Sequence, residues 1–323
     1  MKLTILIPAY NEEGTIKQVI EGIPKKINGV DKQEILVIDD GSNDKTAEIA
    51  KNTGAVVFSS IKNNGLAKTI AVGFAKALER NSDITVILDA DNQYDSKEIS
   101  LIIEPILRKE ADIVLGNRQV KKLDHMPVQK KIGNQIASKT LSMLVGMKIS
   151  DGQTGFRAFT FEALKKIHLF SEYTYTQETI MQAKFKGLKI VEVPITFRKR
   201  YDKSRLISNI GTYAVRTASL LGSTIIYYKS IKFFGILSLI LFSIGSVCAA
   251  FMINHYIITG MIRPYYAIIS LAVLFLVSGA ISTLMTVLSS ISNRQSILLE
   301  QILSEIQDLK RIDTESALDD KTR

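Results

Sequence analysis

Several residue types and motifs are scarce or absent in this 323-residue sequence, which contains no tryptophan, one cysteine and three histidines. The single cysteine, Cys248, lies in an apolar run, so an internal disulfide bond is excluded. Neither a G-x-G-x-x-G nor a G-x-x-x-x-G-K-[ST] motif is present. A dinucleotide-dependent dehydrogenase and a P-loop nucleotide hydrolase are therefore disfavoured. His125 and His168 are isolated histidines, which are more often structural than catalytic.

The composition of the chain is basic and rich in apolar residues. Hydrophobic residues make up 46% and charged residues 23%, and the formal net charge is +9 at pH 7. This balance favours a partner rich in negative charge, such as nucleic acid, anionic lipid or a phosphate-bearing substrate. The apolar run at residues 3–7 is too short for a signal peptide, so we expect the part that follows it to stay in the cytoplasm.

The most informative stretch is a buried strand pattern at residues 84–88 that ends on Asp89 and Asp91, with Gln93 two residues further on. Open α/β sheets bind ligands at the carboxyl ends of such strands. Carboxylate and carboxamide oxygens suit Mg²⁺, which often bridges one or two carboxylates to substrate phosphates. The stretch predicts a D-x-D metal site for a nucleoside diphosphate. The alternative is an ordinary solvated turn at the end of a strand.

Strand patterns alternate with helix patterns through residue 125, with strands expected at 3–7, 34–40, 55–58, 84–88 and 111–115. The first helix should begin near Asn11, a good N-cap residue. This alternation predicts a mainly parallel sheet with helices on both faces. Three strand ends carry polar residues, at 8–11, 39–42 and 89–91, and they should meet at one edge of the sheet. Their convergence favours a nucleotide site.

Four motifs in this half resemble the Rossmann-like GT-A fold of family 2 glycosyltransferases. They are P-A-Y-N-E-E at residues 8–13, V-I-D-D-G-S at 37–42, N-G at 64–65 and D-A-D-N-Q at 89–93. The resemblance implies that Asp89 lies near the nucleotide and the metal, and that Asp91 and Gln93 hold Mg²⁺ or Mn²⁺. The residues that it places around the nucleoside are Pro8, Tyr10, Glu12 and Asp40.

The next segment is similar to the polyprenyl-phosphate branch of that family, which includes dolichyl-phosphate mannose synthases and undecaprenyl-phosphate glucosyltransferases. The similarity rests on G-N-R at residues 116–118, D-x-x-T-G-F-R at 151–157, Glu178 and R-x-x-x-S-R-L at 200–206. Two positions depart from the branch: Thr176 stands where Gln is frequent, and Arg205 where Lys is frequent. Processive synthases carry a Q-x-x-R-W motif, which a chain without tryptophan lacks.

This resemblance implies inverting transfer of one hexose from a GDP- or UDP-linked sugar to a polyprenyl phosphate. A phosphate monoester has a second pKa of about 6, so the acceptor oxygen is ionised at pH 7 and needs no general base. It needs cations that hold it in line with the sugar. We expect Asp89, Asp91, Arg118 and Asp151 to be catalytic, and Asp151 and Glu178 to orient these cations or the sugar. The candidate ligands of the lipid phosphate are Arg118, Lys131, Arg200, Ser204 and Arg205.

The remainder of the chain predicts membrane attachment. After a catalytic domain at 1–203, we expect an amphipathic interface helix at 204–231, for which a helix docked on the core is the alternative. A hairpin at 232–290 should cross the bilayer twice, at 233–254 and 265–288. Lys229, Lys232 and Arg294 flank its outer ends, so both termini should be cytoplasmic. A helical tail at 291–323 should end in disorder, and a homo-oligomer is possible.

Two other functions are open. A family 2 transferase that glycosylates a hydroxyl group would need a carboxylate base, for which Asp151 or Glu178 would serve. A membrane scaffold that has lost catalysis is a second alternative, although the intact Asp89, Asp91 and Gln93 argue against it. A nucleic-acid binder would explain the net charge, but no aromatic residues interleave the basic ones.

Overall fold

The computed structural model describes residues 1–124, 126–169, 175–199 and 210–322, with the backbone alone for residues 210–229 and for most of the tail. The chain divides into two compact units. The first consists of Met1–Leu220 with the end of the chain from Ile306, and the second of Leu221–Glu305. Each unit is described by itself below.

The first unit is built on a seven-stranded sheet with the strand order β3-β2-β1-β4-β6-β5-β7. All neighbouring strands are parallel except β6, which runs antiparallel to both β4 and β5. The mainly parallel sheet is confirmed, whereas no strand was predicted at residues 157–160. The strands are β1 (Lys2–Ala9), β2 (Lys32–Asp39), β3 (Val56–Ser59), β4 (Ile84–Ile87), β5 (Ile113–Asn117), β6 (Arg157–Thr160) and β7 (Ile190–Pro194).

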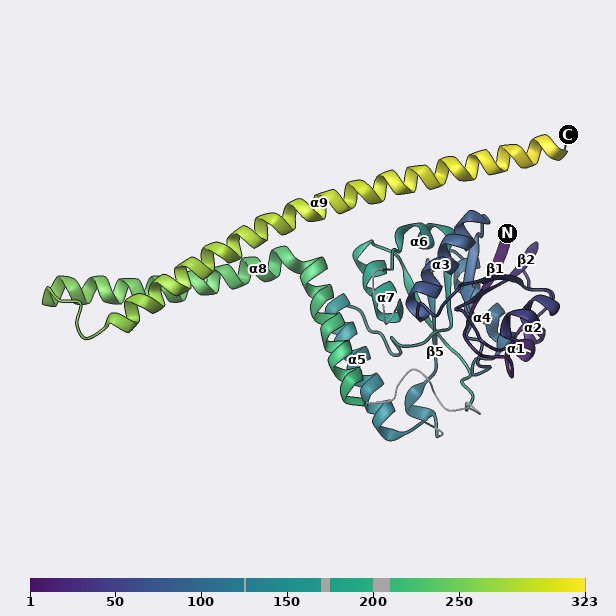
Figure 1. Cartoon of the computed structure of the whole chain (residues 1–323), viewed down its shortest axis with the longest axis horizontal. Helices are drawn as coiled ribbons and strands as arrows, with labels where there is room; N and C mark the ends of the chain where they lie inside the picture. The colour runs from purple at the N-terminus through teal and green to yellow at the C-terminus, as the bar shows by residue number, and fades with distance from the viewer. Residues whose placement is uncertain (125, 170–174, 200–209, 323) are drawn as a thin grey trace. The chain divides into compact units, whose positions relative to one another are not determined.

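Helices cover both faces of this sheet, as predicted (Figure 1). Side chains alternate along β1, so that Leu3, Ile5 and Ile7 pack in one buried cluster with α1 and α4. Leu6 points to the other face and packs in a second cluster with residues of α3, α5 and α7. The helices are α1 (Ile16–Gly22), α2 (Thr46–Asn52), α3 (Leu66–Glu79), α4 (Ile99–Leu107), α5 (Val128–Val145), α6 (Phe161–Lys166) and α7 (Tyr175–Phe185), with 3-10 turns at Ser96–Glu98 and Val120–Lys122.

The first helix begins at Ile16, so the prediction that Asn11 caps it was wrong. Asn11 has a φ of 53°, a left-handed conformation that asparagine tolerates better than most residues. Its backbone N–H donates to Ser42 Oγ over 2.8 Å, and its side-chain oxygen accepts from the N–H of Asn43 over 2.8 Å. Asn11 therefore ties the loop after β1 to the loop after β2, which fixes the two strand ends against each other.

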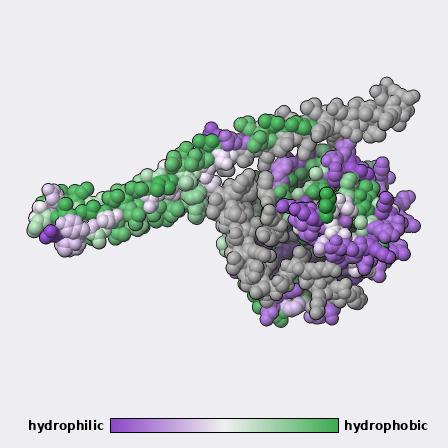
Figure 2. Space-filling model, in the orientation of Figure 1, coloured by the Kyte–Doolittle hydropathy of each residue, from purple (hydrophilic) through white to green (hydrophobic). Residues whose placement is uncertain are grey.

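The second unit is a helical hairpin formed by α8 (Ile210–Thr259) and α9 (Tyr266–Thr322). The start of α8 and the end of α9 belong to the first unit. Ser230–Thr259 and Tyr266–Ser292 are long and apolar enough to cross a membrane. Ser238 and Thr283 join the two helices through a hydroxyl–hydroxyl hydrogen bond of 2.6 Å. A Cβ at Gly245 would lie 2.9 Å from Leu276 Cγ, so this glycine allows the helices to pack closely. The outward surface of the hairpin is largely hydrophobic (Figure 2).

The helices of the C-terminal region are longer than the sequence predicted. Residues 210–231 of the expected interface helix at 204–231 are helical and continue without a break into the first span as part of α8, and their place at a membrane interface stays a prediction. Residues 312–323 were expected to be disordered, yet α9 is helical through Thr322. Extending an existing helix avoids the cost of nucleation, and Glu315, Ala317 and Leu318 are good helix formers.

Candidate active site

A pocket of about 200 Å³ lies at the carboxyl edge of the sheet, where β1, β2 and β4 end beside the N-terminus of α3. A nucleotide site was predicted at this edge, and the structure brings most of the expected residues together there. Six of the seven predicted nucleotide-sugar residues line the pocket, namely Pro8, Tyr10, Glu12, Asp40, Asp89 and Asp91. Gln93 is not among the lining residues.

Asp40 shapes one wall of the pocket. Its Oδ1 accepts from the backbone N–H of Asn64 over 2.8 Å and its Oδ2 from that of Gly65 over 2.9 Å. Gly41 follows with a φ of +74°, and a Cβ there would lie 2.7 Å from the carbonyl carbon of Lys62. Both the conformation and the close approach therefore require glycine at this position. Asp40 thus ties the end of β2 to the start of α3.

The chemistry of the pocket suits a hard divalent cation. Four carboxylates line it, from Glu12, Asp40, Asp89 and Asp91, and the described lining contains no lysine or arginine. A diphosphate would be repelled by this lining unless a cation were bound with it. Within the described parts of the chain, no three His, Cys, Asp or Glu side chains cluster closely enough to hold a metal by themselves. A bound ion would complete its shell with water and phosphate oxygens, as Mg²⁺ commonly does.

Gln93 contacts a segment far away in the sequence. Its Nε2 donates to the carbonyl oxygen of Arg198 over 3.2 Å, and the N–H of Arg198 donates back to the carbonyl of Gln93 over 2.8 Å. Its own N–H donates to Asp91 Oδ1 over 3.1 Å. These contacts anchor the turn that carries Asp91, and a place for Gln93 in the metal shell stays a prediction.

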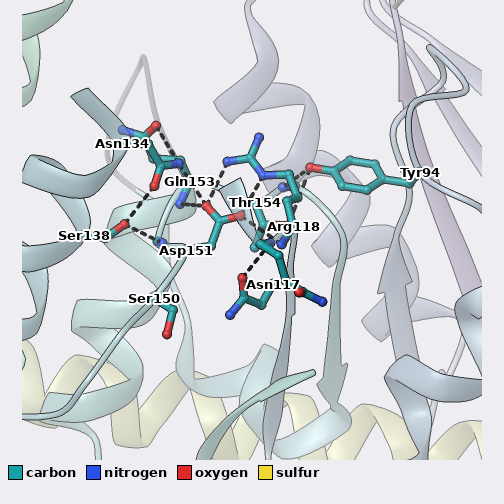
Figure 3. Close-up of polar contacts among 12 residues, drawn as sticks. Tyr94, Asn117, Arg118, Asn134, Ser138, Ser150, Asp151, Gln153 and Thr154 are labelled. Atoms are coloured by element: carbon teal, nitrogen blue, oxygen red, sulfur yellow. Dashed lines mark hydrogen bonds and ion pairs between the residues drawn. The ribbon is translucent and has the colours of Figure 1, made fainter. Parts of the chain in front are cut away.

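A buried ion pair joins Arg118, at the end of β5, to Asp151 (Figure 3). Arg118 Nε donates to Asp151 Oδ2 over 2.7 Å and Nη2 donates to Oδ1 over 2.8 Å. Asn134 of α5 adds a third side-chain donor to Oδ1 over 3.0 Å. Burial opposes ionisation of Asp151, but the hydrogen bonds and the charge of Arg118 outweigh it and lower the pKa of this carboxyl. A carboxylate held in this way is a poor general base, and it is well suited to orienting Arg118.

The loop that follows Asp151 reaches the end of β4. A Cβ on Gly155 would lie 2.7 Å from Asp89 Oδ2, so the Asp89 carboxylate packs directly against this glycine. The N–H of Gly155 donates to the hydroxyl of Tyr94 over 2.8 Å. Tyr94 is 2% exposed, and burial raises its pKa to about 12, so it remains a neutral hydroxyl at physiological pH. One loop therefore supports both Asp89 and the Arg118–Asp151 pair.

The other predicted phosphate and sugar ligands fall in different places. Lys131 is partly exposed on α5 three residues before Asn134, so the two are neighbours on the helix surface. Glu178 is 7% exposed in α7, accepts from Gln182 Nε2 over 3.1 Å, and does not line the pocket. The three remaining candidates, Arg200, Ser204 and Arg205, lie outside the described residues.

Sequence reasoning missed four residues that build this site: Tyr94, Asn134, Arg157 and Glu192. The oxygens of Glu192, in β7, accept from the N–H groups of Ser150 and Asp151. Arg157 is completely buried at the start of β6. The available signal for Arg157 was its place at the end of the D-x-x-T-G-F-R motif, to which no separate role was assigned. The contacts of the other three depend on strand pairing and helix packing that local sequence does not show.

Comparisons with known proteins show which family the chain resembles. The family described as Glycosyl transferase family 2 matches residues 4–168. The chain is 32% identical over 224 residues to UDP-N-acetylglucosamine–dolichyl-phosphate N-acetylglucosaminyltransferase of Methanococcus voltae. The aligned region covers 62% of this chain and 88% of that enzyme. It is 29% identical over 215 residues to undecaprenyl-phosphate mannosyltransferase of Micrococcus luteus. The aligned region covers 62% of this chain and 85% of that enzyme.

The fold is also found among solved structures. Glucosyl-3-phosphoglycerate synthase from Mycobacterium tuberculosis in complex with UDP superimposes with a TM-score of 0.54 over 69% of this chain and 79% of that one, at 20% identity. At this identity the likeness concerns the fold alone, and it confirms the predicted GT-A architecture. The family match covers residues 4–168, about half of the chain, and the relatives at about 30% identity carry names of the same class of enzyme. The protein is a glycosyltransferase that belongs to glycosyl transferase family 2.

Proposed function

We propose that this enzyme transfers a single hexose from a GDP- or UDP-linked sugar to a polyprenyl phosphate, with inversion at the anomeric carbon. The observation that best supports this proposal is that two sites of different charge lie at the carboxyl edge of the sheet. The donor pocket is lined by four carboxylates, whereas the neighbouring site holds Arg118 with Lys131 nearby on α5. The first suits a metal-bound nucleotide and the second an anionic acceptor.

In the donor half, Asp89 and Asp91 would hold Mg²⁺ or Mn²⁺, with Gln93 as a further oxygen donor. When bound, the ion stabilises the negative charge that the nucleoside diphosphate gains as it leaves. A structure of the M. tuberculosis synthase contains Mn²⁺ together with UDP, which supports this assignment by analogy of fold. Pro8, Tyr10, Glu12 and Asp40 line the same pocket and would enclose the nucleoside.

In the acceptor half, Arg118 would hold the phosphate in line with the sugar, together with Lys131, Arg200, Ser204 and Arg205. The ionised phosphate attacks directly, so the reaction needs no base. Asp151 fits this scheme because its oxygens are engaged by Arg118 and Asn134. The names of relatives that act on dolichyl phosphate and undecaprenyl phosphate support the same acceptor class.

The surface of α5 supports a lipid-borne acceptor. Val128, Ile132, Ile136 and Met143 are 51–75% exposed on one side of this helix, opposite the buried Ala137 and Leu141. The helix contains three lysines and no acidic residue. An apolar stripe beside lysines suits the boundary of an anionic membrane. With the two candidate spans, it supports a catalytic unit at the cell membrane, for which we propose cytoplasmic termini.

The direct test is a transfer assay with the full chain in detergent. The assay offers radiolabelled UDP- and GDP-sugars, polyprenyl phosphate, and Mg²⁺ or Mn²⁺, alongside the variant Asp91→Ala. We expect label from one donor to enter the lipid fraction, and this incorporation to disappear with a chelator and in Asp91→Ala. Donor binding without transfer to any polyprenyl phosphate would contradict the proposed acceptor, and loss of all donor binding would contradict the proposed donor site.

A further inference from the structure

Arg157 is a completely buried arginine outside the donor pocket, and its hydrogen bonds connect two separate segments. On one side, its Nε donates to the carbonyl of Thr154 over 2.9 Å and its Nη2 to that of Gly152 over 3.1 Å. On the other side, its Nη1 donates to the carbonyl of Thr176 over 2.6 Å and to the hydroxyl of Thr179. The guanidinium thus joins the 151–155 loop to the first turn of α7.

The 151–155 loop needs such partners because it is buried. Asp151, Gly152, Thr154 and Gly155 have almost no exposed surface, so their backbone groups cannot be satisfied by bulk water. Side chains take over this role. The hydroxyl of Tyr175 donates to the Gly155 carbonyl over 3.3 Å, and Ser138 Oγ accepts from the Gly152 N–H over 3.1 Å. Arg157 donates to two backbone carbonyls of the loop. Among the hydrogen bonds of the described residues, it is the only one of these side chains that also donates to a backbone carbonyl of α7.

The position of this loop determines the position of two groups in the proposed mechanism. At one end, Gly155 packs against the Asp89 carboxylate. At the other end, Asp151 holds Arg118 through two hydrogen bonds. A shift of the loop by a fraction of an ångström would move both the metal side and the acceptor side of the site.

We propose that Arg157 is a positioning residue of the reaction, which holds the 151–155 loop so that Asp89 and Arg118 keep their places. This inference rests on the proposed function, because it assumes that Asp89 serves a metal–nucleotide complex. Arg157 itself contacts neither substrate nor metal. Burial lowers its pKa to about 10, so it remains a cation at neutral pH and keeps all its donors.

The test compares Arg157→Met and Arg157→Lys with a matched control, Arg80→Met. Arg80 also makes a two-point contact, in this case with Glu34, but it lies near the amino ends of β1 and β2, far from the pocket edge. Binding of MnCl₂ with UDP or GDP to the full chain in detergent is measured by calorimetry. We expect Arg157→Met to weaken Mn²⁺–nucleotide binding about tenfold or more, as disruption of groups behind a metal ligand commonly does. Arg157→Lys should recover part of the loss, and Arg80→Met should bind as the wild type does.

A second measurement reports on the loop directly. In metal-free protein, amide hydrogen exchange of residues 151–157 should be faster in Arg157→Met than in wild type and unchanged in Arg80→Met. Tyr175→Phe, which removes one donor to the loop and keeps the ring, should weaken Mn²⁺–nucleotide binding about threefold. If Arg157→Met does not fold, Arg157→Lys and Tyr175→Phe decide the question.

The outcomes separate this inference from the proposed function. Wild-type protein that binds neither nucleotide with Mn²⁺ would overturn the proposed donor site and this inference with it. Wild-type binding that persists unchanged in the Arg157 and Tyr175 variants would overturn the positioning role alone. Equal weakening in Arg157→Met and Arg80→Met would also overturn it, since general destabilisation would then explain the loss.

Discussion

At the scale of single residues, the pairing of Asp151 with Arg118 helps to decide whether the acceptor is a phosphate or a hydroxyl group. Both oxygens of Asp151 accept hydrogen bonds from Arg118, and this pairing outweighs the opposing effect of burial and keeps the carboxyl ionised. Abstraction of a proton from an alcohol requires a base that can be protonated near neutral pH. Asp151 does not meet this requirement, although it was one of the two candidate bases, with Glu178, for the alternative hydroxyl acceptor.

Replacement of Asp151 tests this distinction. We expect Asp151→Asn to lower the transfer rate about 100-fold, because Arg118 loses its charged anchor and the acceptor phosphate is misplaced. The dependence of rate on pH should keep its midpoint at about 6 in both proteins, since it reflects the second ionisation of the acceptor phosphate. The pKa of Asp151 is lowered, so this group is ionised throughout that range and contributes no step of its own. A pH dependence that vanishes in Asp151→Asn would show instead that Asp151 is the titrating base.

Gly155 offers a second test at this scale. A Cβ at this position would lie 2.7 Å from Asp89 Oδ2, so Gly155→Ala must displace the carboxylate or the loop. We expect the Mn²⁺ concentration for half-maximal activity to rise about tenfold, because a neighbour of a metal ligand has moved. Gly54→Ala is a useful control, because a φ of +94° makes alanine strained there too, while nothing lies within 4 Å of the added Cβ and the position is not part of the pocket lining. Unaltered metal dependence in Gly155→Ala would contradict the placement of Asp89.

At the scale of elements, the amino edge of the sheet is held by an ion network that lies apart from the pocket. Glu34 of β2 accepts from Arg80 Nε over 2.9 Å, and Lys2 Nζ of β1 lies 3.1 Å from Glu34 Oε2. The hydrogen bond from Arg80 is the main cause that lowers the pKa of Glu34, from 4.5 to about 2. This network fastens β1, β2 and the end of α3 to one another.

The stabilising effect of Glu34 should depend on pH in a definite direction. Because its folded-state pKa is depressed, the contribution is fully present above pH 4.5 and declines as the pH falls toward 2. Arg80 is 33% exposed, and solvent screening reduces the expected contribution to about 1–2 kcal/mol. Urea unfolding of Glu34→Gln, followed by circular dichroism, should show this loss at pH 7 and a smaller one at pH 3. An equal loss at both pH values would mean that packing, and not ionisation, is responsible.

Much of the sheet was predictable from the sequence, because β1, β2 and β4 contain largely apolar, β-branched segments that lead into polar residues. Their parallel pairing then brought Tyr10, Asp40 and Asp89 to one edge, as expected. The strand β6 was not predictable, since its four residues follow a turn-rich segment and run antiparallel to both neighbours. The roles of Tyr94 and Arg157 depend on that strand, so they too became visible only in the folded chain.

At the scale of the whole molecule, the catalytic unit and the hairpin each present apolar surface to their surroundings. The hairpin exposes apolar side chains along both helices, and α5 of the catalytic unit exposes its own apolar stripe. Large exposed apolar surfaces commonly mark membrane or protein contacts. The function proposed here requires the enzyme to handle a soluble donor and a lipid-borne acceptor, and both surfaces fit that requirement.

If the apolar stripe on α5 contacts a membrane, its loss should affect long-chain and short-chain acceptors differently. In the double variant Ile132→Ser and Ile136→Ser, transfer to long-chain polyprenyl phosphate in bilayer nanodiscs should fall about tenfold, because apolar area that holds the helix at the interface is lost. Transfer to a short, water-soluble prenyl phosphate should change little. Val72→Ser, at an exposed site on α3, should affect neither acceptor. Equal loss with both acceptors would contradict a membrane role for this surface.

The central claim is that the acceptor is the phosphate of a polyprenyl chain, and one competition measures it most directly. Purified enzyme with its sugar donor and Mn²⁺ is offered polyprenyl phosphate and the free polyprenol of the same length, and the products are identified by mass spectrometry. We expect a hexose–phosphate–polyprenyl product alone, since the site holds Arg118, which we propose as a phosphate ligand, and its partner Asp151 is unsuited to act as a base. A hexose joined directly to the polyprenol oxygen would contradict it.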